Sequence, residues 1–249
     1  MNFTKKIIIK ILLKIGVYNL IKPYIKFYNR GLINMENSLN KIPKFDIIID
    51  VGAGISTDAL YQHSKDAFIY AFEPNPNLLK ILKNKLSNRN HKIFEFGLSN
   101  QKSEQLLKLN NTGSSLHSWS KLTNIHNKKF KKQKIKLEKL EDIIDENLLK
   151  GKEVILKIDT EGHELKILEG SKKLLSSINY LLIETSILKR FEDSYEMLDV
   201  LKFLDNNGFK IGIFAELGTW NKMYRYADIL FVKKNNYEKL INSISNSGI

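Results

Sequence analysis

The stretch Phe45-Asp-Ile-Ile-Ile-Asp-Val-Gly-Ala-Gly54 indicates the class of fold. Its apolar run over residues 45–51 has the length of a buried strand, and the glycines that follow permit a tight turn. A helix is predicted from this turn to about residue 64. Ligands bind at the carboxyl ends of strands in open parallel sheets, so the turn is the first candidate for a binding site.

The same alternation of a short apolar run with an amphipathic segment continues along the chain. Further strands are predicted at 67–73, 91–96, 154–159 and 180–184, and two closing strands at 209–214 and 227–232. This order predicts an α/β fold, a seven-stranded, mostly parallel, Rossmann-like sheet with helices on both faces. The last two strands are joined by too few residues for a crossover helix, so we expect a terminal antiparallel hairpin.

Three segments lie outside this repeating pattern, which gives a main domain over residues 45–235. Residues 100–150 form an insert with a strongly basic run, and residues 236–249 form a C-terminal tail. Residues 1–44 form a basic amphipathic segment in which Lys6, Lys10 and Lys14 share one side of a predicted helix. That helix lies either on an anionic membrane surface or against the main domain or a second subunit.

The composition limits the class of protein. The 249 residues carry a net charge of +13, but only four of the 40 basic residues are arginine. Lysine lacks the planar fork that arginine offers to phosphate and base edges, so the charge indicates a solvated surface or a general attraction for anionic substrates. The chain has no cysteine, which excludes disulfides and thiolate sites. We expect a cytoplasmic protein, with contact to the inner face of the membrane as an alternative.

The turn after the first strand and the end of the second strand predict a nucleoside pocket. The glycine turn departs from the dinucleotide pattern because Thr57 stands where the third glycine would be, which favours a cofactor without a pyrophosphate. Glu73 ends the second strand, where a carboxylate can accept hydrogen bonds from two ribose hydroxyls. The predicted cofactor-binding residues are Asp50, Gly52, Ala53, Gly54, Ser56, Glu73, Pro74, Asn75, Gly97 and Leu98.

Four blocks of the sequence resemble the FkbM family of methyltransferases. They are Asp50-Val-Gly-Ala53, Phe72-Glu-Pro-Asn-Pro76, Leu156-Lys-Ile-Asp-Thr-Glu-Gly-His-Glu164 and Ala227-Asp-Ile-Leu-Phe-Val232. The first block departs from the family pattern because Gly54 comes early and Ser56-Thr57-Asp58 follow. The resemblance implies the class I methyltransferase fold, S-adenosylmethionine as cofactor with S-adenosylhomocysteine as product, and O-methylation of hydroxyls on sugars or other precursors.

The third block predicts the catalytic end of the site. Methyl transfer from a sulfonium needs mainly an aligned acceptor and removal of its proton. Asp159 and His163 are the candidate bases, and histidine titrates closest to neutral pH. Lys157 lies on the same side of its strand as Asp159, where it would stabilise a developing alkoxide or keep Asp159 ionised.

The acceptor is expected to contact the insert and the loop over residues 218–226. The predicted substrate-binding residues are Glu161, Glu184, Ser115, Trp220, Tyr224 and Arg225. Asp159, Glu161 and Glu184 also form an oxygen-ligand set of the kind that Mg²⁺ accepts, but no chelating acceptor is indicated, so we predict no metal.

These residues predict an O-methyltransferase that acts on a hydroxyl of a carbohydrate, either a nucleotide-linked sugar or a precursor of a capsule or surface polysaccharide. Two alternatives remain at this point. The net charge also suits an RNA methyltransferase, although the shortage of arginine argues against nucleic acid. The basic N-terminal segment also suits a non-catalytic, membrane-associated module that binds S-adenosylmethionine.

Overall fold

The computed structural model describes residues 35–246 except 55–56, 111–112, 122, 124–127 and 221–222. The predicted amphipathic helix with Lys6, Lys10 and Lys14 lies outside the described residues, as does Ser56. In the part of the chain that is described, no helix has both the length and the apolar character needed to cross a bilayer.

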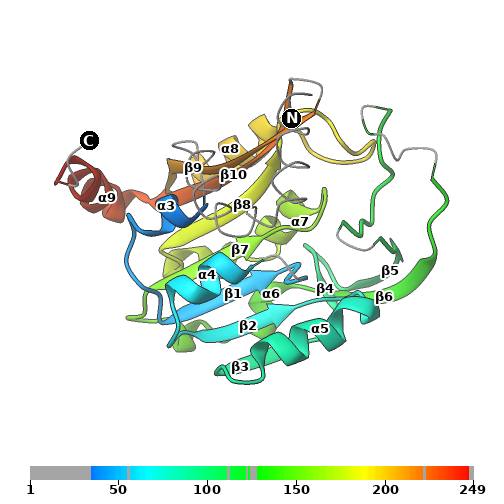
Figure 1. The fold of residues 1–249 in the computed structure, drawn as a ribbon, viewed down its shortest axis with the longest axis horizontal. Coiled ribbons are helices and arrows are strands. Elements are labelled where there is room, and N and C mark those ends of the chain that lie inside the picture. The colour runs from blue at the N-terminus through cyan, green and yellow to red at the C-terminus, as the bar shows by residue number, and fades with distance from the viewer. Residues whose placement is uncertain are drawn as a thin grey trace, which may run out of the picture.

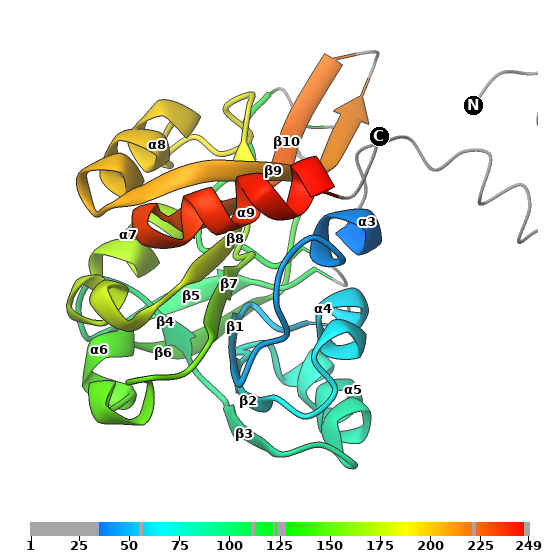
Figure 2. The ribbon, with the colours of Figure 1, turned by 90° about the vertical axis from the view of Figure 1, so that its left-hand side faces the viewer.

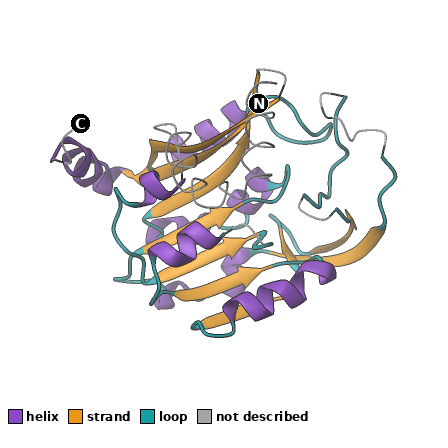
Figure 3. Ribbon diagram, in the orientation of Figure 1, coloured by secondary structure: helices purple, strands orange, loops and turns teal. Residues whose placement is uncertain are grey.

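A seven-stranded sheet forms the centre of the molecule, as predicted (Figures 1 and 3). Its strands run in the order β3-β2-β1-β7-β8-β10-β9, and β10 is antiparallel to both of its neighbours. Strands β1 and β7 pair in parallel with Asp50 opposite Lys157, which places these two chemically important residues side by side. The strands are β1 (Ile47–Val51), β2 (Phe68–Phe72), β3 (His91–Phe94), β7 (Val154–Ile158), β8 (Tyr180–Ser186), β9 (Phe209–Trp220) and β10 (Met223–Lys233).

Helices cover both faces of the sheet, which appears between them in Figure 2. On one face, α3 (Met35–Leu39), α4 (Asp58–His63), α5 (Pro76–Leu86) and α9 (Lys234–Asn246) enclose a core that includes Ile48 and Leu82. On the other face, α6 (Leu140–Ile143), α7 (Glu164–Glu169), α8 (Met197–Asn206) and the 3₁₀ turns η1 (Glu146–Leu148) and η2 (Lys172–Ser177) enclose a core that includes Ile49 and Leu156. Strands β1 and β7 are buried throughout, as expected for a parallel sheet that is covered twice.

The predicted insert contains most of a second, three-stranded sheet in the order β4-β6-β5. Its strands are β4 (Gly97–Leu98), β5 (Ser103–Lys108) and β6 (Lys132–Glu138). Leu107, Ile135 and Leu137 are buried, whereas the alternating residues Lys134 and Lys136 are exposed. The small sheet therefore turns an apolar face toward the main domain and a basic face outward.

The structure differs from the predicted elements in three places. The terminal hairpin is longer than expected, because antiparallel pairing of β9 with β10 continues through residues 215–220 and 223–226, so most of the predicted 218–226 loop is strand. The sequence pattern predicts a helix from about Glu164 to Leu175, but α7 ends at Glu169; at Gly170, which follows, a Cβ would lie 2.0 Å from the Ser99 carbonyl oxygen. The predicted C-terminal tail contains most of α9, which buries Leu240 against the sheet.

Candidate active site

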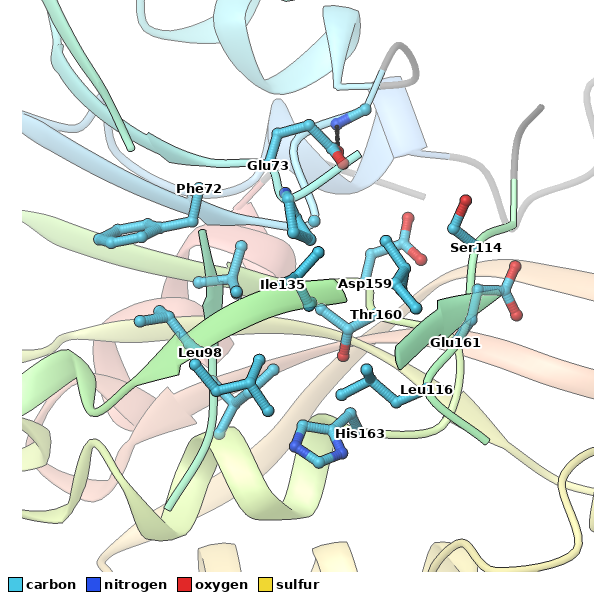
Figure 4. Close-up of a pocket in the computed structure, with 18 of the residues that line it drawn as sticks. Phe72, Glu73, Leu98, Ser114, Leu116, Ile135, Asp159, Thr160, Glu161 and His163 are labelled. Carbon is cyan, nitrogen blue, oxygen red and sulfur yellow. Dashed lines mark hydrogen bonds between the residues drawn. The ribbon is translucent and has the colours of Figure 1, made fainter. Parts of the chain in front are cut away.

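A cavity of about 360 Å³ lies at the carboxyl ends of β1, β2 and β7, within the size range of small-molecule sites (Figure 4). The main sheet and the loops that follow it form one wall, and the small sheet forms the other. Its polar lining comes from Glu73, Ser114, Asp159, Thr160, Glu161 and His163, and its apolar lining includes Phe72, Leu98, Leu107, Leu116, Ile135 and Leu137.

The glycine turn after β1 serves two different purposes. At Gly52, which has φ +72°, a Cβ would lie 1.9 Å from the Asp159 carbonyl oxygen, so glycine is required for the turns after β1 and β7 to pack together. At Gly54, with φ +41°, a Cβ would have ordinary contacts, and the requirement is the left-handed backbone itself. The turn lines the cavity at both glycines.

Glu73 is held in the cavity wall at the end of β2. Its side chain is buried, and each carboxylate oxygen accepts one backbone N–H, from Gly54 at 2.9 Å and from Asn75 at 2.7 Å. Burial raises the pKa of Glu73, and these two hydrogen bonds oppose the rise. A carboxylate has about four acceptor positions, so two remain for the hydroxyls of a ligand.

A buried charged network connects the ends of β1 and β7 beneath the cavity. We call Asp50, Tyr61, Lys157 and Asp159 the strand-end network. Tyr61 donates a hydrogen bond to Asp50 at 2.6 Å, and the Lys157 ammonium lies 3.2 Å from Asp50 and 3.5 Å from Asp159. The two aspartates raise the pKa of Lys157, against the opposing effect of burial, so the lysine stays charged. Only Asp159 of the four lines the cavity, since Asp50 is completely buried.

The loop from Asp159 to Glu164 turns through an unusual backbone conformation. Glu161 has φ 53°, a left-handed conformation that costs free energy in any residue except glycine. The buried Glu164 carboxylate compensates by accepting hydrogen bonds from the backbone N–H groups of Thr160, at 2.9 Å, and Gly162, at 3.1 Å. Glu164 therefore fixes the loop and has no place in the cavity lining.

A second buried network lies beside Glu161, and it includes a residue that the sequence analysis missed. We call Glu161, Glu184 and Arg190 the loop network. Arg190 contacts Glu161 at 3.2 Å and forms a short ion pair with Glu184. Burial raises the pKa of Glu161 to about 7 and that of Glu184 well above its usual range; the neighbouring Asp159 carboxylate adds to both rises, and Arg190 opposes them. No local motif around Arg190 identifies it; only its being one of four arginines is unusual.

His163 lines the cavity but has no free ring nitrogen. Its Nε2 lies 3.0 Å from the Ser99 hydroxyl, and its Nδ1 lies 3.1 Å from Nε2 of His117. Burial lowers the pKa of His163 to about 3 and also lowers the pKa of His117, so both imidazoles are neutral at physiological pH. A neutral imidazole whose two nitrogens are both bonded within the protein is poorly placed to take a proton from an acceptor.

The other predicted residues occupy three kinds of position. Pro74, Gly97 and Leu98, which are predicted cofactor contacts, line the cavity, whereas Ala53 and Asn75 are buried next to it. The Asn75 side chain caps the start of α5. Of the predicted substrate-binding residues, Glu161 lines the cavity, but Ser115 and Glu184 support it from outside the lining. Trp220, Tyr224 and Arg225 lie on the β9–β10 hairpin, and neither Tyr224 nor Arg225 lines the cavity.

The charge of the cavity discriminates between classes of cofactor. Among the described residues that line it, three are carboxylates and none is lysine or arginine. A pyrophosphate would be repelled by such a lining, whereas a sulfonium and an ammonium would be attracted. S-adenosylmethionine carries both of these cations, so its charge is compatible with this lining. Among the described residues no group of three or more His, Asp or Glu side chains is arranged to hold a metal ion.

Comparison with known proteins identifies the family of this chain. A family profile described as the methyltransferase FkbM domain matches residues 50–211. Hexuronic acid methyltransferase AglP of Haloferax volcanii is 26% identical over 152 residues, which are 59% of this chain and 58% of that protein. The chain thus spans less than two thirds of this relative's length.

Two solved methyltransferase structures are similar to this chain. The FkbM methyltransferase of Methylobacillus flagellatus is 16% identical with a TM-score of 0.47, over 76% of this chain and 43% of that one. Precorrin-6y C5,15-methyltransferase of Geobacter metallireducens is 15% identical with a TM-score of 0.42, over 79% and 85%. Because the FkbM profile matches more than half of its residues, the chain belongs to the FkbM family of S-adenosylmethionine-dependent methyltransferases.

Proposed function

We propose that this protein transfers the methyl group of S-adenosylmethionine to a hydroxyl of a carbohydrate, either a nucleotide-linked sugar or a precursor of a surface polysaccharide. The observation that carries the proposal is the position of Asp159. Its side chain is 27% exposed, lines the cavity and lies beside a buried lysine. A hydroxyl acceptor needs such a base, and the name of the Haloferax relative adds support for a sugar.

The cofactor would be held by Glu73, the Gly54 turn and the apolar wall of the small sheet. Glu73 accepts hydrogen bonds from the ribose hydroxyls, and Leu98 and Leu137 pack against the adenine. Gly97 leaves room for the Leu137 side chain, since a Cβ at residue 97 would lie 2.7 Å from it. When bound, S-adenosylmethionine supplies a methyl carbon that is already activated by its sulfonium.

Asp159 is the proposed general base, and Lys157 the group that holds it in place. Lys157 is held by its ion pair with the buried Asp50, and the same ammonium lies 3.5 Å from Asp159, so it would hold the Asp159 carboxylate at the cavity. The acceptor hydroxyl would donate a hydrogen bond to this carboxylate, and Asp159 would take up its proton when the methyl group leaves the sulfonium sulfur for the acceptor oxygen, with S-adenosylhomocysteine as the leaving group. The buried ends of β1 and β7 form the floor of the cavity and would keep water away from it.

Between the two candidate bases, geometry favours Asp159 over His163. Both ring nitrogens of His163 are occupied by Ser99 and His117, and its lowered pKa makes it a weak base. The proposed role of His163 is to fix the cavity wall at the start of α7.

The test is a methyl-transfer assay on the full chain with radiolabelled S-adenosylmethionine. The probe acceptors are glucose and glucuronic acid, each also as its uridine diphosphate conjugate, and a transfer RNA mixture serves as the alternative substrate. We expect label in at least one sugar probe and none in RNA. Mild alkali separates the products, because a methyl ester is hydrolysed and a methyl ether is stable.

Calorimetry with S-adenosylmethionine and S-adenosylhomocysteine accompanies the assay. Binding of both, together with an alkali-stable methylated sugar, is the expected result. Label confined to RNA with a steep salt dependence would replace the proposal with an RNA methyltransferase. Binding of neither ligand would indicate a module without this activity, and an alkali-labile product would move the acceptor from a hydroxyl to a carboxylate.

A further inference from the structure

Arg190 uses its whole guanidinium within the protein. The side chain is 8% exposed, Nε donates to the Ser186 hydroxyl at 3.0 Å, Nη1 contacts Glu161 at 3.2 Å, and Nη2 donates to Glu184. The guanidinium also lies over the Tyr226 ring, with its carbon 4.9 Å from the ring centre. A planar fork bonded at all three nitrogens has a fixed orientation, so it also fixes the carboxylates that it contacts.

The segment that carries Arg190 is tied to the insert. The backbone N–H of Ser120 donates to the Arg190 carbonyl at 2.7 Å, and that of Glu192 donates to the Ser118 carbonyl at 2.9 Å. Trp119 and Phe191 form an isolated bridge between the same two segments. These contacts hold the guanidinium at a set distance from the loop that contains Glu161.

Glu161 is held between Arg190 and the wall of the cavity. Its left-handed backbone is fixed by the Ser115 hydroxyl, which donates to the Glu161 carbonyl at 2.6 Å. One carboxylate oxygen contacts Arg190, and the other would lie 2.8 Å from a Cβ at Gly113, another residue of the cavity wall. The absence of a side chain at Gly113 therefore leaves room for a carboxylate oxygen at the cavity.

We propose that Arg190 is a positioning residue that holds the Glu161 carboxylate, ionised and correctly turned, where it accepts a hydrogen bond from a second hydroxyl of the acceptor. This inference rests on the proposed function, because the hydroxyl that Glu161 would bind belongs to the proposed sugar acceptor. Arg190 acts only through Glu161, since it does not line the cavity itself.

The charges around Glu161 explain why a cation is needed behind it. Burial and the carboxylates of Asp159 and Glu164 raise the pKa of Glu161, whereas Arg190 and Arg225 lower it. Glu184 shares the Arg190 guanidinium and competes for it. With Arg190 present the pKa is about 7, so the ionised form is available at physiological pH. Without Arg190 the neutral form would predominate.

The first test is independent of any acceptor. The side-chain carboxyl of Glu161 is titrated by carbon-13 NMR in glutamate-labelled protein, with its signal assigned by its loss in Glu161→Gln. In Arg190→Gln we expect the pKa of Glu161 to rise by about one unit or more, the size of effect expected for a lost opposite charge. Lys189→Gln, a change at the exposed neighbouring residue, serves as the matched control and should leave the titration unchanged. An unchanged titration in Arg190→Gln overturns the inference.

The second test uses the sugar probe that is methylated in the assay above. Arg190→Lys, which keeps the charge but not the fork, should raise KM for the sugar about tenfold, the effect of roughly one lost charged hydrogen bond, with the affinity for S-adenosylmethionine unchanged. Arg190→Gln should also move the acidic limb of the kcat/KM profile to higher pH. In the Glu161→Gln background neither Arg190 variant should have a further effect on KM.

The two tests separate the failure of this inference from that of the proposed function. If no sugar probe is methylated, the carbon-13 titration still decides whether Arg190 sets the ionisation of Glu161. If sugars are methylated but Arg190→Lys lowers kcat and cofactor affinity together, without a change in KM for the sugar, Arg190 has a general structural role and the inference is wrong.

Discussion

The strand-end network and the loop network are built from the same kinds of group, yet they are held in different ways. In the strand-end network, parallel pairing of β1 with β7 places Asp50 opposite Lys157, so regular backbone geometry brings the charges together. In the loop network, Glu161 needs a left-handed turn, and Arg190 approaches it from a distant loop.

The difference teaches how this site divides its tasks. Strand pairing gives one fixed distance between residues, which suits a base that must face a reacting atom. Loops are more easily varied, which suits the part of a site that recognises the acceptor. We therefore expect changes in the strand-end network to affect turnover and folding, and changes in the loop network to affect acceptor recognition. The following variants test this division, in order of decreasing effect.

The largest effect is expected from Asp159→Asn, which removes the proposed base and keeps the shape of the side chain. Turnover of the methylated sugar probe should fall by about 10²- to 10⁴-fold, the usual range for a lost general base. The affinity for S-adenosylmethionine should change little. Asp66→Asn, at an exposed aspartate, is the control. Full activity in Asp159→Asn would show that the general base is not a residue of the strand-end network.

A smaller effect is expected from Glu73→Gln, in the part of the cavity that neither network reaches. The carboxylate accepts two backbone N–H groups, and an amide can accept from only one side while its NH₂ opposes the other donor. The dissociation constant of S-adenosylmethionine should rise about 10- to 100-fold, the equivalent of one or two charged hydrogen bonds. Calorimetry measures this directly. Unchanged affinity would place the ribose elsewhere, and Glu238→Gln on α9 is the control.

Tyr61→Phe tests whether the strand-end network stabilises the fold as well as the base. It removes the hydroxyl that donates to the buried Asp50 carboxylate, so the free energy of unfolding should fall by about 1–3 kcal/mol. The measurement is urea denaturation followed by circular dichroism. Tyr224→Phe, at a side chain that is 55% exposed, should stay within about 0.5 kcal/mol of the original protein. Equal effects of the two changes would show that Asp50 does not depend on Tyr61.

The smallest effect is a pH dependence that arises from His163. Its pKa is lowered to about 3 in the folded protein, so below pH 6.5 the unfolded chain takes up a proton that the folded protein does not. This group's contribution to stability is therefore complete above pH 6.5 and is lost as the pH falls.

Between pH 6.5 and 5.5 the loss from His163 amounts to about 1 kcal/mol. Glu161 and Asp228 titrate with the opposite sign, because burial raises the pKa of each to about 7. The effect of His163 is therefore measured as the difference between the original protein and His163→Gln in urea denaturation at both pH values. Parallel pH dependences would contradict a neutral, buried His163.

The sequence alone indicated the seven-stranded sheet, the terminal hairpin, and the grouping of Glu73 and Asp159 at one edge of it. These follow from local rules: a buried parallel strand is apolar along its length, and ligands gather at the carboxyl ends of such strands. The extent of the β9–β10 hairpin was not foreseen, because pairing beyond the sheet depends on a partner strand and not on local pattern.

Only the tertiary structure decided which of these side chains face the cavity. Asp50 belongs to the same motif as Gly54, yet it is completely buried and serves Lys157. His163 has its two ring nitrogens occupied by Ser99 and His117, which are 64 and 46 residues away in the chain. Arg190 has no motif of its own and meets Glu161 only because two loops cross. The physical reason is that hydrogen bonds and ion pairs between distant segments depend on how the elements pack, which no local pattern of residues records.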